Sequence, residues 1–199
     1  MLKIEGINAG YGRLHVLFDV TTKVKDKGIT VLVGPNGSGK STLLKTVLGI
    51  TQVYSGKILF NGRNITGLPP HVVTKLGIAY LPQVDSVFAN LKVRENLLMA
   101  GYILSRDEAK ERTREVLGEF PVLNEYVDRR AGTLSGGERQ MLAMAIAMMR
   151  RPKIMLFDEP TASLAPKMAL EVLEKIISLR DNYGMTLVLA EQNARRALE

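Results

Sequence analysis

Apolar and polar residues follow two strand-like patterns along this chain. Some segments alternate between the two kinds of residue, which is typical of antiparallel strands with one face in water. They are residues 2–7, 19–24 and 57–61. Other segments are short runs rich in apolar and β-branched residues, which predict buried strands. They are residues 29–33, 154–157 and 185–189, and residues 78–81 predict one more strand.

Helical spacing of apolar residues predicts a second set of elements. They span residues 41–48, 93–103, 106–120, 136–149 and 166–179, with breaks near Ser105 and Pro121. The last helix lies between two buried strands, so strand, helix and strand predict a right-handed parallel crossover. We therefore expect one domain over residues 1–199, with an α/β core, an antiparallel β subdomain and an inserted helical subdomain at about 88–150.

A complete G-x-x-x-x-G-K-[ST] phosphate-binding loop follows the strand at 29–33. It reads Gly34-Pro35-Asn36-Gly37-Ser38-Gly39-Lys40-Ser41-Thr42. Glycines let the backbone N–H groups approach a polyphosphate, Lys40 would reach the terminal phosphates, and the Ser41 hydroxyl would hold Mg²⁺. The helix predicted after the loop directs the positive end of its dipole at the phosphates. A chance glycine-rich turn is disfavoured, because strand, loop and helix stand in the required order.

A second motif, at residues 134–138, precedes a Met- and Ala-rich helix. Ser135 and Glu138 have the spacing of a capping box, in which the serine accepts from a backbone N–H and the glutamate reaches back. A capping box does not explain the two adjacent glycines Gly136 and Gly137, which cost backbone entropy at a helix start. Glycines there suit a surface that a phosphate approaches closely.

A third motif is the apolar strand at 154–157, which ends in two carboxylates. Asp158 is suited to the Mg²⁺ shell and Glu159 to activating a water molecule. A solvated turn is the alternative, and the phosphate-binding loop upstream disfavours it.

With these motifs the chain resembles the nucleotide-binding subunits of ABC transporters, from about residue 2 to its last residue. Tyr11 stands where that family stacks an aromatic ring on adenine, and Gln83 stands at the lid-loop position. The motif at 134–138 matches the family signature. Each element is moderately specific, and the set in this order is very specific. The resemblance implies a P-loop NTPase fold of the ABC ATPase type with ATP and Mg²⁺ as cofactors.

Within that family, the chain is most similar to the ATP-binding subunits of branched-chain amino-acid uptake systems. Ala165 stands where most relatives have Asp, Gln192 stands where most carry a switch histidine, and residues 130–133 also look like that subfamily. Gln83 departs from the subfamily, in which Glu is common, so the transported solute stays open.

The resemblance also implies how the site works. Two such domains would face each other, each nucleotide lying between one phosphate-binding loop and the partner's Ser135, Gly136 and Gly137. Glu159 would polarise the attacking water. Gln83 would link the γ-phosphate, the metal and the helical subdomain. Gln192 would orient the water by a hydrogen bond, but its amide cannot carry a proton as histidine does.

The implied partners are transmembrane permease subunits, a second ATP-binding subunit that is either identical or different, and, indirectly, a solute-binding protein. Composition agrees with a cytoplasmic subunit on the inner face of the membrane. No apolar run approaches the roughly 20 residues of a membrane span, the N-terminus is no signal peptide, and the chain has no cysteine. The net charge of +7 is spread among acids, so we expect no nucleic-acid partner. We expect His15 and His71 to be surface residues.

Two other functions of ABC-type proteins are disfavoured by the sequence. ATPases that act on DNA insert long heptad-patterned coiled coils before the signature, and the helical region here is too short for them. Non-hydrolytic relatives on ribosomes are disfavoured by Glu159 and by the single domain, since such relatives usually carry two domains in one chain. The sequence ends inside a helix predicted to begin near Asn193. Since the family usually continues further, the chain is either naturally short or cut short.

Overall fold

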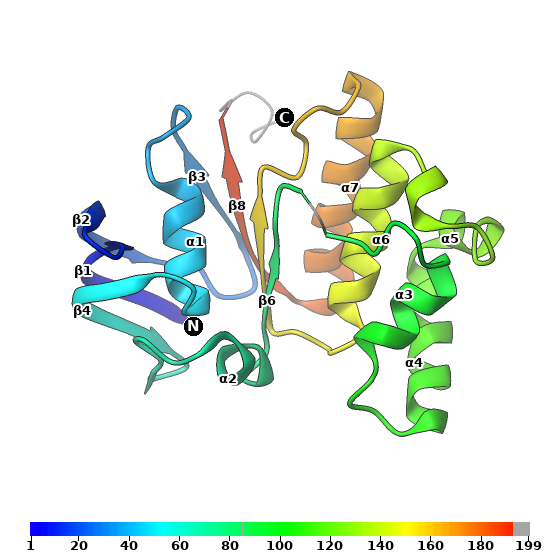
Figure 1. The fold of residues 1–199 in the computed structure, drawn as a ribbon, viewed down its shortest axis with the longest axis horizontal. Coiled ribbons are helices and arrows are strands. Elements are labelled where there is room, and N and C mark those ends of the chain that lie inside the picture. The colour runs from blue at the N-terminus through cyan, green and yellow to red at the C-terminus, as the bar shows by residue number, and fades with distance from the viewer. Residues whose placement is uncertain (85, 193–199) are drawn as a thin grey trace. The chain divides into compact units, whose positions relative to one another are not determined.

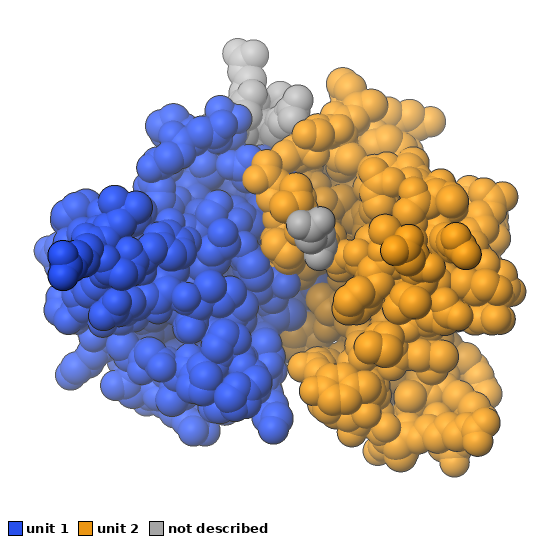
Figure 2. Space-filling view, viewed as in Figure 1, with its two compact units in different colours: residues 1–80, 153–159, 177–199 blue, residues 81–152, 160–176 orange. Residues whose placement is uncertain are grey.

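In the computed structural model, residues 1–84 and 86–192 are described, and the chain divides into two compact units (Figure 2). Unit 1 contains Met1–Tyr80, Lys153–Glu159 and the chain from Ile177 onward. Unit 2 contains Leu81–Pro152 and Pro160–Ile176. The region predicted to be helical, about 88–150, lies within unit 2. The helix predicted to begin near Asn193 lies outside the described residues.

Unit 1 holds the predicted antiparallel sheet, in the strand order β2-β1-β4-β5 (Figure 1). Its strands are β1 (Leu2–Tyr11), β2 (Leu14–Lys23), β4 (Gln52–Phe60) and β5 (Arg63–Asn64). The predicted bounds were too short, since β2 begins at Leu14 instead of 19 and β4 at Gln52 instead of 57. Shifts of register between β1 and both neighbouring strands interrupt the alternation of apolar and polar residues. The sequence pattern therefore predicted only the regularly alternating part of each strand.

The second sheet has the order β3-β8-β7-β6, and β8 pairs in parallel with β3 and with β7. Its strands are β3 (Ile29–Val33), β6 (Ile78–Leu81), β7 (Ile154–Asp158) and β8 (Thr186–Glu191). Every residue of β7 and β8 is buried, as predicted. The prediction that 29–33 is also buried was wrong, because most residues of β3 are half-buried and Val33 is exposed. Helix α7 (Pro166–Tyr183) joins the parallel strands β7 and β8, which confirms the predicted connection, although the helix ends later than 179.

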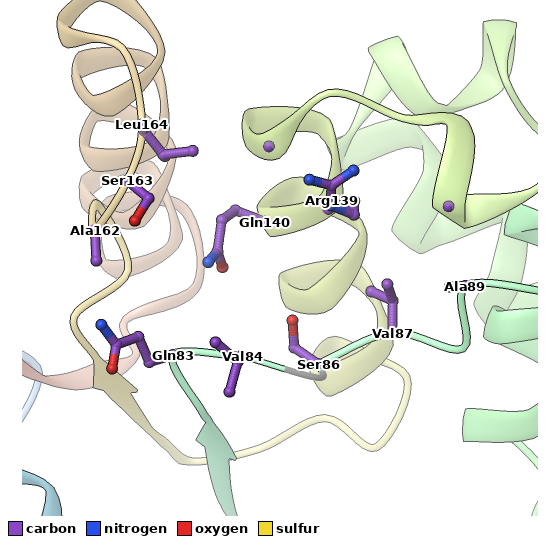
Figure 3. A pocket seen from close by; sticks show the side chains of 12 residues that line it. Gln83, Val84, Ser86, Val87, Ala89, Arg139, Gln140, Ala162, Ser163 and Leu164 are labelled. Carbon is purple, nitrogen blue, oxygen red and sulfur yellow. The ribbon is translucent and has the colours of Figure 1, made fainter.

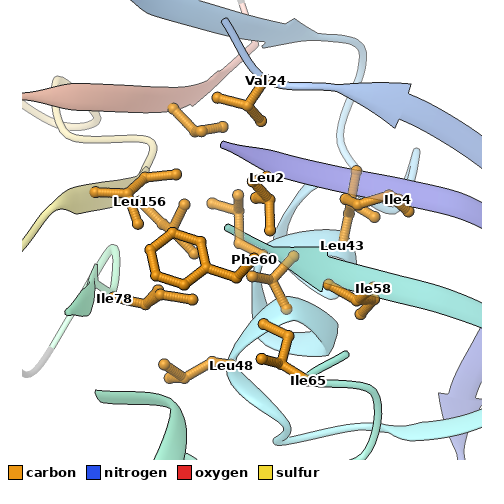
Figure 4. Close-up of a cluster of buried hydrophobic side chains, with 14 of the residues drawn as sticks. Leu2, Ile4, Val24, Leu43, Leu48, Ile58, Phe60, Ile65, Ile78 and Leu156 are labelled. Carbon is orange, nitrogen blue, oxygen red and sulfur yellow. The ribbon is translucent and has the colours of Figure 1, made fainter. Parts of the chain in front are cut away.

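Helix α1 (Lys40–Leu48) is anchored in unit 1 by its apolar face. Leu43, Leu44, Val47 and Leu48 are buried in one cluster with strand residues such as Ile58. Figure 4 shows Leu43 and Leu48 in this cluster, together with Ile58 and other strand residues. Burying each large aliphatic side chain contributes about 1.5–3 kcal/mol. This packing fixes the N-terminus of α1, where the phosphate-binding motif ends.

One helix of unit 1 was not predicted from the sequence. Helix α2 (Pro70–Lys75) begins at a proline, which is favoured in the first helical turn. It is only one and a half turns long and buries a single residue, Val73, so it leaves no clear periodicity in the sequence.

Unit 2 contains α3 (Val93–Ala100), α4 (Arg106–Glu119) and α6 (Gly136–Met148), which were predicted with somewhat different bounds. It also contains α5 (Pro121–Glu125) and the short 3-10 helix Ala131–Thr133, which were not predicted. The prediction that one helix reaches residue 103 was wrong, because α3 ends before Gly101. A Cβ at Gly101 would lie 3.1 Å from the Met149 Cε, so the glycine allows close packing there. Within the described residues, none of the helices combines the length and apolar character that a membrane crossing needs.

Candidate nucleotide-binding site

The loop at 34–39 depends on glycines for its shape. Gly37 and Gly39 have φ angles of 81° and 90°, in the left-handed region that side chains rarely adopt. A Cβ at Gly34 would lie 2.6 Å from the Ser38 Oγ, and a Cβ at Gly39 would lie 2.9 Å from the Leu17 Cδ2. The Ser38 N–H donates to the Pro35 carbonyl at 3.2 Å, which closes the loop.

The loop leads directly into α1, whose first residue is Lys40. The first N–H groups of a helix have no partner within the helix, and the dipole favours negative charge at this end. Asn36, Gly37 and Ser38 are exposed, whereas Thr42 is buried on the helix. The strand, glycine loop and helix N-terminus therefore form an anion-binding arrangement.

The Lys40 ammonium group connects this loop to the end of β7. Its Nζ donates to the Gly34 carbonyl at 2.8 Å and to the Pro35 carbonyl at 3.1 Å. It also lies 3.3 Å from the Glu159 Oε1, and both side chains of this ion pair are largely buried. Lysine Nζ has three donors. Lys40 therefore holds the two predicted motifs of unit 1 together.

Asp158 is buried at the end of β7, with both carboxylate oxygens occupied. The Ser41 hydroxyl donates to its Oδ1 at 2.7 Å, and the Tyr80 hydroxyl donates to its Oδ2 at 2.9 Å. Burial, the hydrogen bond to Asp158 and the negative charge of Asp158 raise the pKa of Tyr80 far above its usual range, so its phenol remains a proton donor at neutral pH. Tyr80 was not predicted from the sequence, because only the neighbouring position of β6 and β7 brings it to this carboxylate.

Ser41 and Asp158 also fit a divalent cation such as Mg²⁺. Their hydroxyl and carboxylate oxygens are adjacent, and Mg²⁺ takes hard oxygen ligands, usually one or two from protein with phosphates and water completing the shell. No group of three or more His, Asp or Glu side chains suited to a metal occurs in the part of the chain that the structure describes. Gln83, the third predicted ligand, belongs to unit 2, so its part in the metal site stays a prediction.

Glu159 and Gln192 follow neighbouring strands of the parallel sheet. Glu159 comes directly after β7 and Gln192 directly after β8, and Asp158 pairs with Ala190 across these strands. The Glu159 N–H donates to the Ala190 carbonyl at 2.9 Å, and its φ of 49° is unusual for a residue with a side chain. Gln192 is exposed. Their catalytic roles remain predictions.

Tyr11 is the last residue of β1 and has 43% of its surface exposed. A residue that served only to pack the small sheet would be more deeply covered, so exposure favours the predicted stacking on a base. His71 is exposed, as predicted. His15 is not a simple surface residue, because its ring is stacked on Phe18 and its Nε2 is buried without a hydrogen-bond partner among the described residues.

The predicted signature lies in unit 2 at the start of α6. The Ser135 Oγ accepts from the Glu138 N–H at 3.3 Å, and the Ser135 N–H donates to the Glu138 Oε2 at 2.7 Å, so the capping box is present. Burial raises the pKa of Glu138, but the hydrogen bonds from the backbone and hydroxyl of Ser135 and from Tyr126 outweigh it and lower the pKa below the usual value.

The two glycines of the signature have a packing role that the sequence did not reveal. A Cβ at Gly136 would lie 2.8 Å from the Leu164 Cδ2, and a Cβ at Gly137 would overlap the Met168 Cε. Glycine therefore suits this packing, because a Cβ at either position would force the end of the Leu164 or Met168 side chain to move. Their presence alone does not indicate a phosphate, although Ser135 itself is exposed.

Gln83 lines a cavity of about 440 Å³ within unit 2. Figure 3 shows it at one end of the cavity, with Gln140 from α6 and Ser163 nearby. Gly136 of the signature lines the same cavity. Within this unit, the structure thus brings the predicted lid-loop residue and the signature to one cavity. Sequence analysis did not single out Gln140, Arg139 or Ser163.

Comparisons with known proteins agree with this geometry. The family model described as ABC transporter matches residues 17–162. The chain is 55% identical, over its full length and 84% of the relative, to the probable branched-chain amino acid transport ATP-binding protein LivF of Archaeoglobus fulgidus. It is 43% identical, over its full length and 85% of the relative, to the high-affinity branched-chain amino acid transport ATP-binding protein BraG of Pseudomonas aeruginosa. The ADP conformation of an ABC transporter ATP-binding cassette matches with a TM-score of 0.89 at 28% identity, over 100% of this chain and 83% of the other.

Proposed function

Because this chain belongs to the ABC transporter family and is one of its ATP-binding, ATP-hydrolysing subunits, we propose that it drives uptake of branched-chain amino acids. The observation that carries this proposal is the 55% identity over the full chain to a relative named for that transport. Ala165 and Gln192, which differ from most of the family, support the same subfamily.

The proposed chemistry uses the residues that meet in unit 1. Lys40 would bind the terminal phosphates, while Ser41 and Asp158 would hold Mg²⁺ through their adjacent oxygens. The metal, when bound, neutralises charge on the phosphates. Glu159 would accept the proton of the attacking water. Gln192, at the end of the next strand, would orient that water by a hydrogen bond without accepting its proton.

The proposed assembly places the chain at the inner face of the membrane as a peripheral subunit. ATP-binding subunits of this family work with transmembrane permease subunits and dimerise. For this chain we propose that the second ATP-binding subunit is a similar but non-identical protein, and that a solute-binding protein acts through the permease. Gln83, on the wall of the cavity in unit 2, would link the nucleotide to the helical subdomain.

Tyr80→Phe is expected to weaken Mg²⁺ binding in the presence of ATP about tenfold, because partners that orient a metal ligand typically have effects of this size. The substitution leaves the buried Asp158 Oδ2 without its hydroxyl donor. Titration of ATPase activity with Mg²⁺ measures the effect, and ATP binding in EDTA provides the control that should not change. An unaltered Mg²⁺ titration would show that Tyr80 does not orient Asp158 for the metal.

Tyr11→Ala is expected to weaken ATP binding by roughly 1–3 kcal/mol, the range measured for stacking of a base on an aromatic ring. Tyr11→Phe keeps the aromatic face and should bind ATP nearly as well as the wild type. Equilibrium binding of a fluorescent ATP analogue and its displacement by ATP give both values. A large loss in the Phe variant would argue against stacking.

Reconstitution tests the proposed function directly. The chain is assembled with its permease subunits and second ATP-binding subunit in proteoliposomes, with the solute-binding protein outside. We expect leucine, isoleucine and valine to stimulate ATP hydrolysis and to accumulate inside, and glutamate to do neither. Stimulation by glutamate alone, or by none of these amino acids, would overturn the proposed solute and leave the ATPase assignment intact.

A further inference from the structure

The strand that ends in Tyr11 is flanked by two irregular pairings. On one side Asn8 lies opposite Ser55 and Ala9 opposite Val53, which leaves Tyr54 as the extra residue of β4. On the other side, Ala9 lies opposite Leu17 and Gly10 opposite His15, so β2 also has one extra residue. Such shifts re-aim side chains and are frequent next to functional sites.

Because of the register shift in β4, the Tyr54 side chain reaches the turn that follows Tyr11. Its hydroxyl lies 2.9 Å from the Gly12 carbonyl and 3.3 Å from the Leu14 carbonyl, the residues on either side of Arg13. A phenol has one hydrogen to donate, which these two carbonyl oxygens share. The hydroxyl therefore ties together the two ends of the hairpin turn.

The contact between the Tyr54 hydroxyl and the turn depends on glycine at position 10. A Cβ at Gly10 would overlap the Leu14 carbonyl and lie 2.8 Å from the Tyr54 hydroxyl. Glycine at position 10 gives the hydroxyl room to reach the turn. The Tyr54 ring is also held from the side, since the His15 ring meets it edge-on at 5.0 Å and is itself stacked on Phe18 at 4.0 Å.

The same turn is linked to the phosphate-binding loop. Leu17 of β2 is in close contact with Gly39, since a Cβ there would lie 2.9 Å from the Leu17 Cδ2, and Val16 lies slightly further away. The hairpin is thus fixed at two points: the glycine loop fixes β2, and Tyr54 fixes the turn. Tyr11 lies directly before this turn and opposite Leu14 of β2, and its ring is exposed.

We propose that Tyr54 is a positioning residue for the nucleotide base, which acts by holding the Gly12–Leu14 turn and through it the ring of Tyr11. The inference rests on the proposed stacking of Tyr11 on adenine. It assigns to a residue of β4 an effect on affinity for the base, with no direct contact between Tyr54 and the nucleotide.

Tyr54→Phe tests the proposal, because it removes the hydroxyl and keeps the ring that packs on His15. We expect the KM and Kd for ATP to rise about three- to tenfold, the effect of one lost hydrogen bond, with kcat unchanged. Binding of inorganic tripolyphosphate, which has no base, should not change. Tyr102→Phe is the matched control, since Tyr102 is 71% exposed and lies in unit 2, and it should match the wild type in every measurement.

A double variant separates this inference from the proposed stacking. If Tyr54 acts through Tyr11, adding Tyr54→Phe to Tyr11→Ala should cause no further loss of ATP affinity. If Tyr11→Ala alone binds ATP normally, the stacking is wrong. If Tyr11→Ala weakens binding and Tyr54→Phe does not, only the role of Tyr54 is wrong. Equal losses for ATP and tripolyphosphate in Tyr54→Phe would show a general structural effect and overturn the inference.

Discussion

Glu159→Gln is expected to lower ATP turnover by about 10²–10⁴, the range typical of losing a general base, and to leave ATP binding intact. Glutamine has the same shape but cannot accept a proton from water. The backbone that places residue 159 is held by its hydrogen bond to Ala190, so the substitution should not move the chain. Removing the negative charge 3.3 Å from the Lys40 Nζ also leaves that ammonium group freer to attract phosphate.

Phosphate release under saturating ATP measures the turnover of this variant, and equilibrium binding measures its affinity. Glu174→Gln is the matched control, because it makes the same chemical change at an exposed position of α7 and should leave both quantities unchanged. Turnover of Glu159→Gln equal to the wild type would remove Glu159 from the catalytic role and leave the phosphates themselves to be tested as the base.

Ser135→Arg is expected to abolish hydrolysis while ATP still binds to the single chain. In a shared site the large charged side chain would lie where the partner's nucleotide meets the signature, so half of the phosphate clamp would be lost. The substitution also removes the capping box of α6, which costs about 0.5–2 kcal/mol of stability. A capping role alone predicts lower stability with unchanged activity per folded molecule.

The chain contains a matched control for the loss of the cap. Ser105 begins α4 with the same capping box, its Oγ accepting from the Glu108 N–H at 3.3 Å. Ser105→Arg should therefore lose similar stability and retain normal hydrolysis. Ser135→Ala should lose the cap without the bulky charge and keep far more activity than Ser135→Arg. If Ser135→Ala and Ser135→Arg lose activity in proportion to stability alone, the signature is only a cap.

Mixing two inactive variants tests whether the site is shared between chains. A Ser135→Arg chain supplies an intact phosphate-binding loop, and a Lys40→Ala chain supplies an intact signature. On random pairing about half of the dimers are mixed, and each has one complete composite site. We expect hydrolysis to return on mixing and to increase with protein concentration, because self-association without the membrane partners is weak. No recovery, with a wild-type rate independent of protein concentration, would contradict the shared site.

The sequence alone determined those parts of the fold that depend on local pattern. Strands β3 and β6 have the predicted bounds, and β7 and β8 differ by one or two residues, because short runs rich in apolar and β-branched residues favour strands. The phosphate-binding loop could also be predicted from the sequence, because the positive φ angles at Gly37 and Gly39 disfavour other residues there. A capping box is also a local feature, and Ser135 makes the one that its spacing predicted.

Tertiary structure decided the contacts between residues far apart in the chain. Tyr80 and Asp158 are 78 positions apart and meet only because β6 and β7 are neighbours in the sheet. Tyr54 reaches the turn after Tyr11 only because a shift of register re-aims it, and an alternating pattern cannot reveal such a shift. The packing of Gly136 and Gly137 could not be predicted either, because the side chains that lie against them, Leu164 and Met168, come from the segment after β7. Local pattern specifies which elements form, and the pairing and packing of those elements specify which side chains meet.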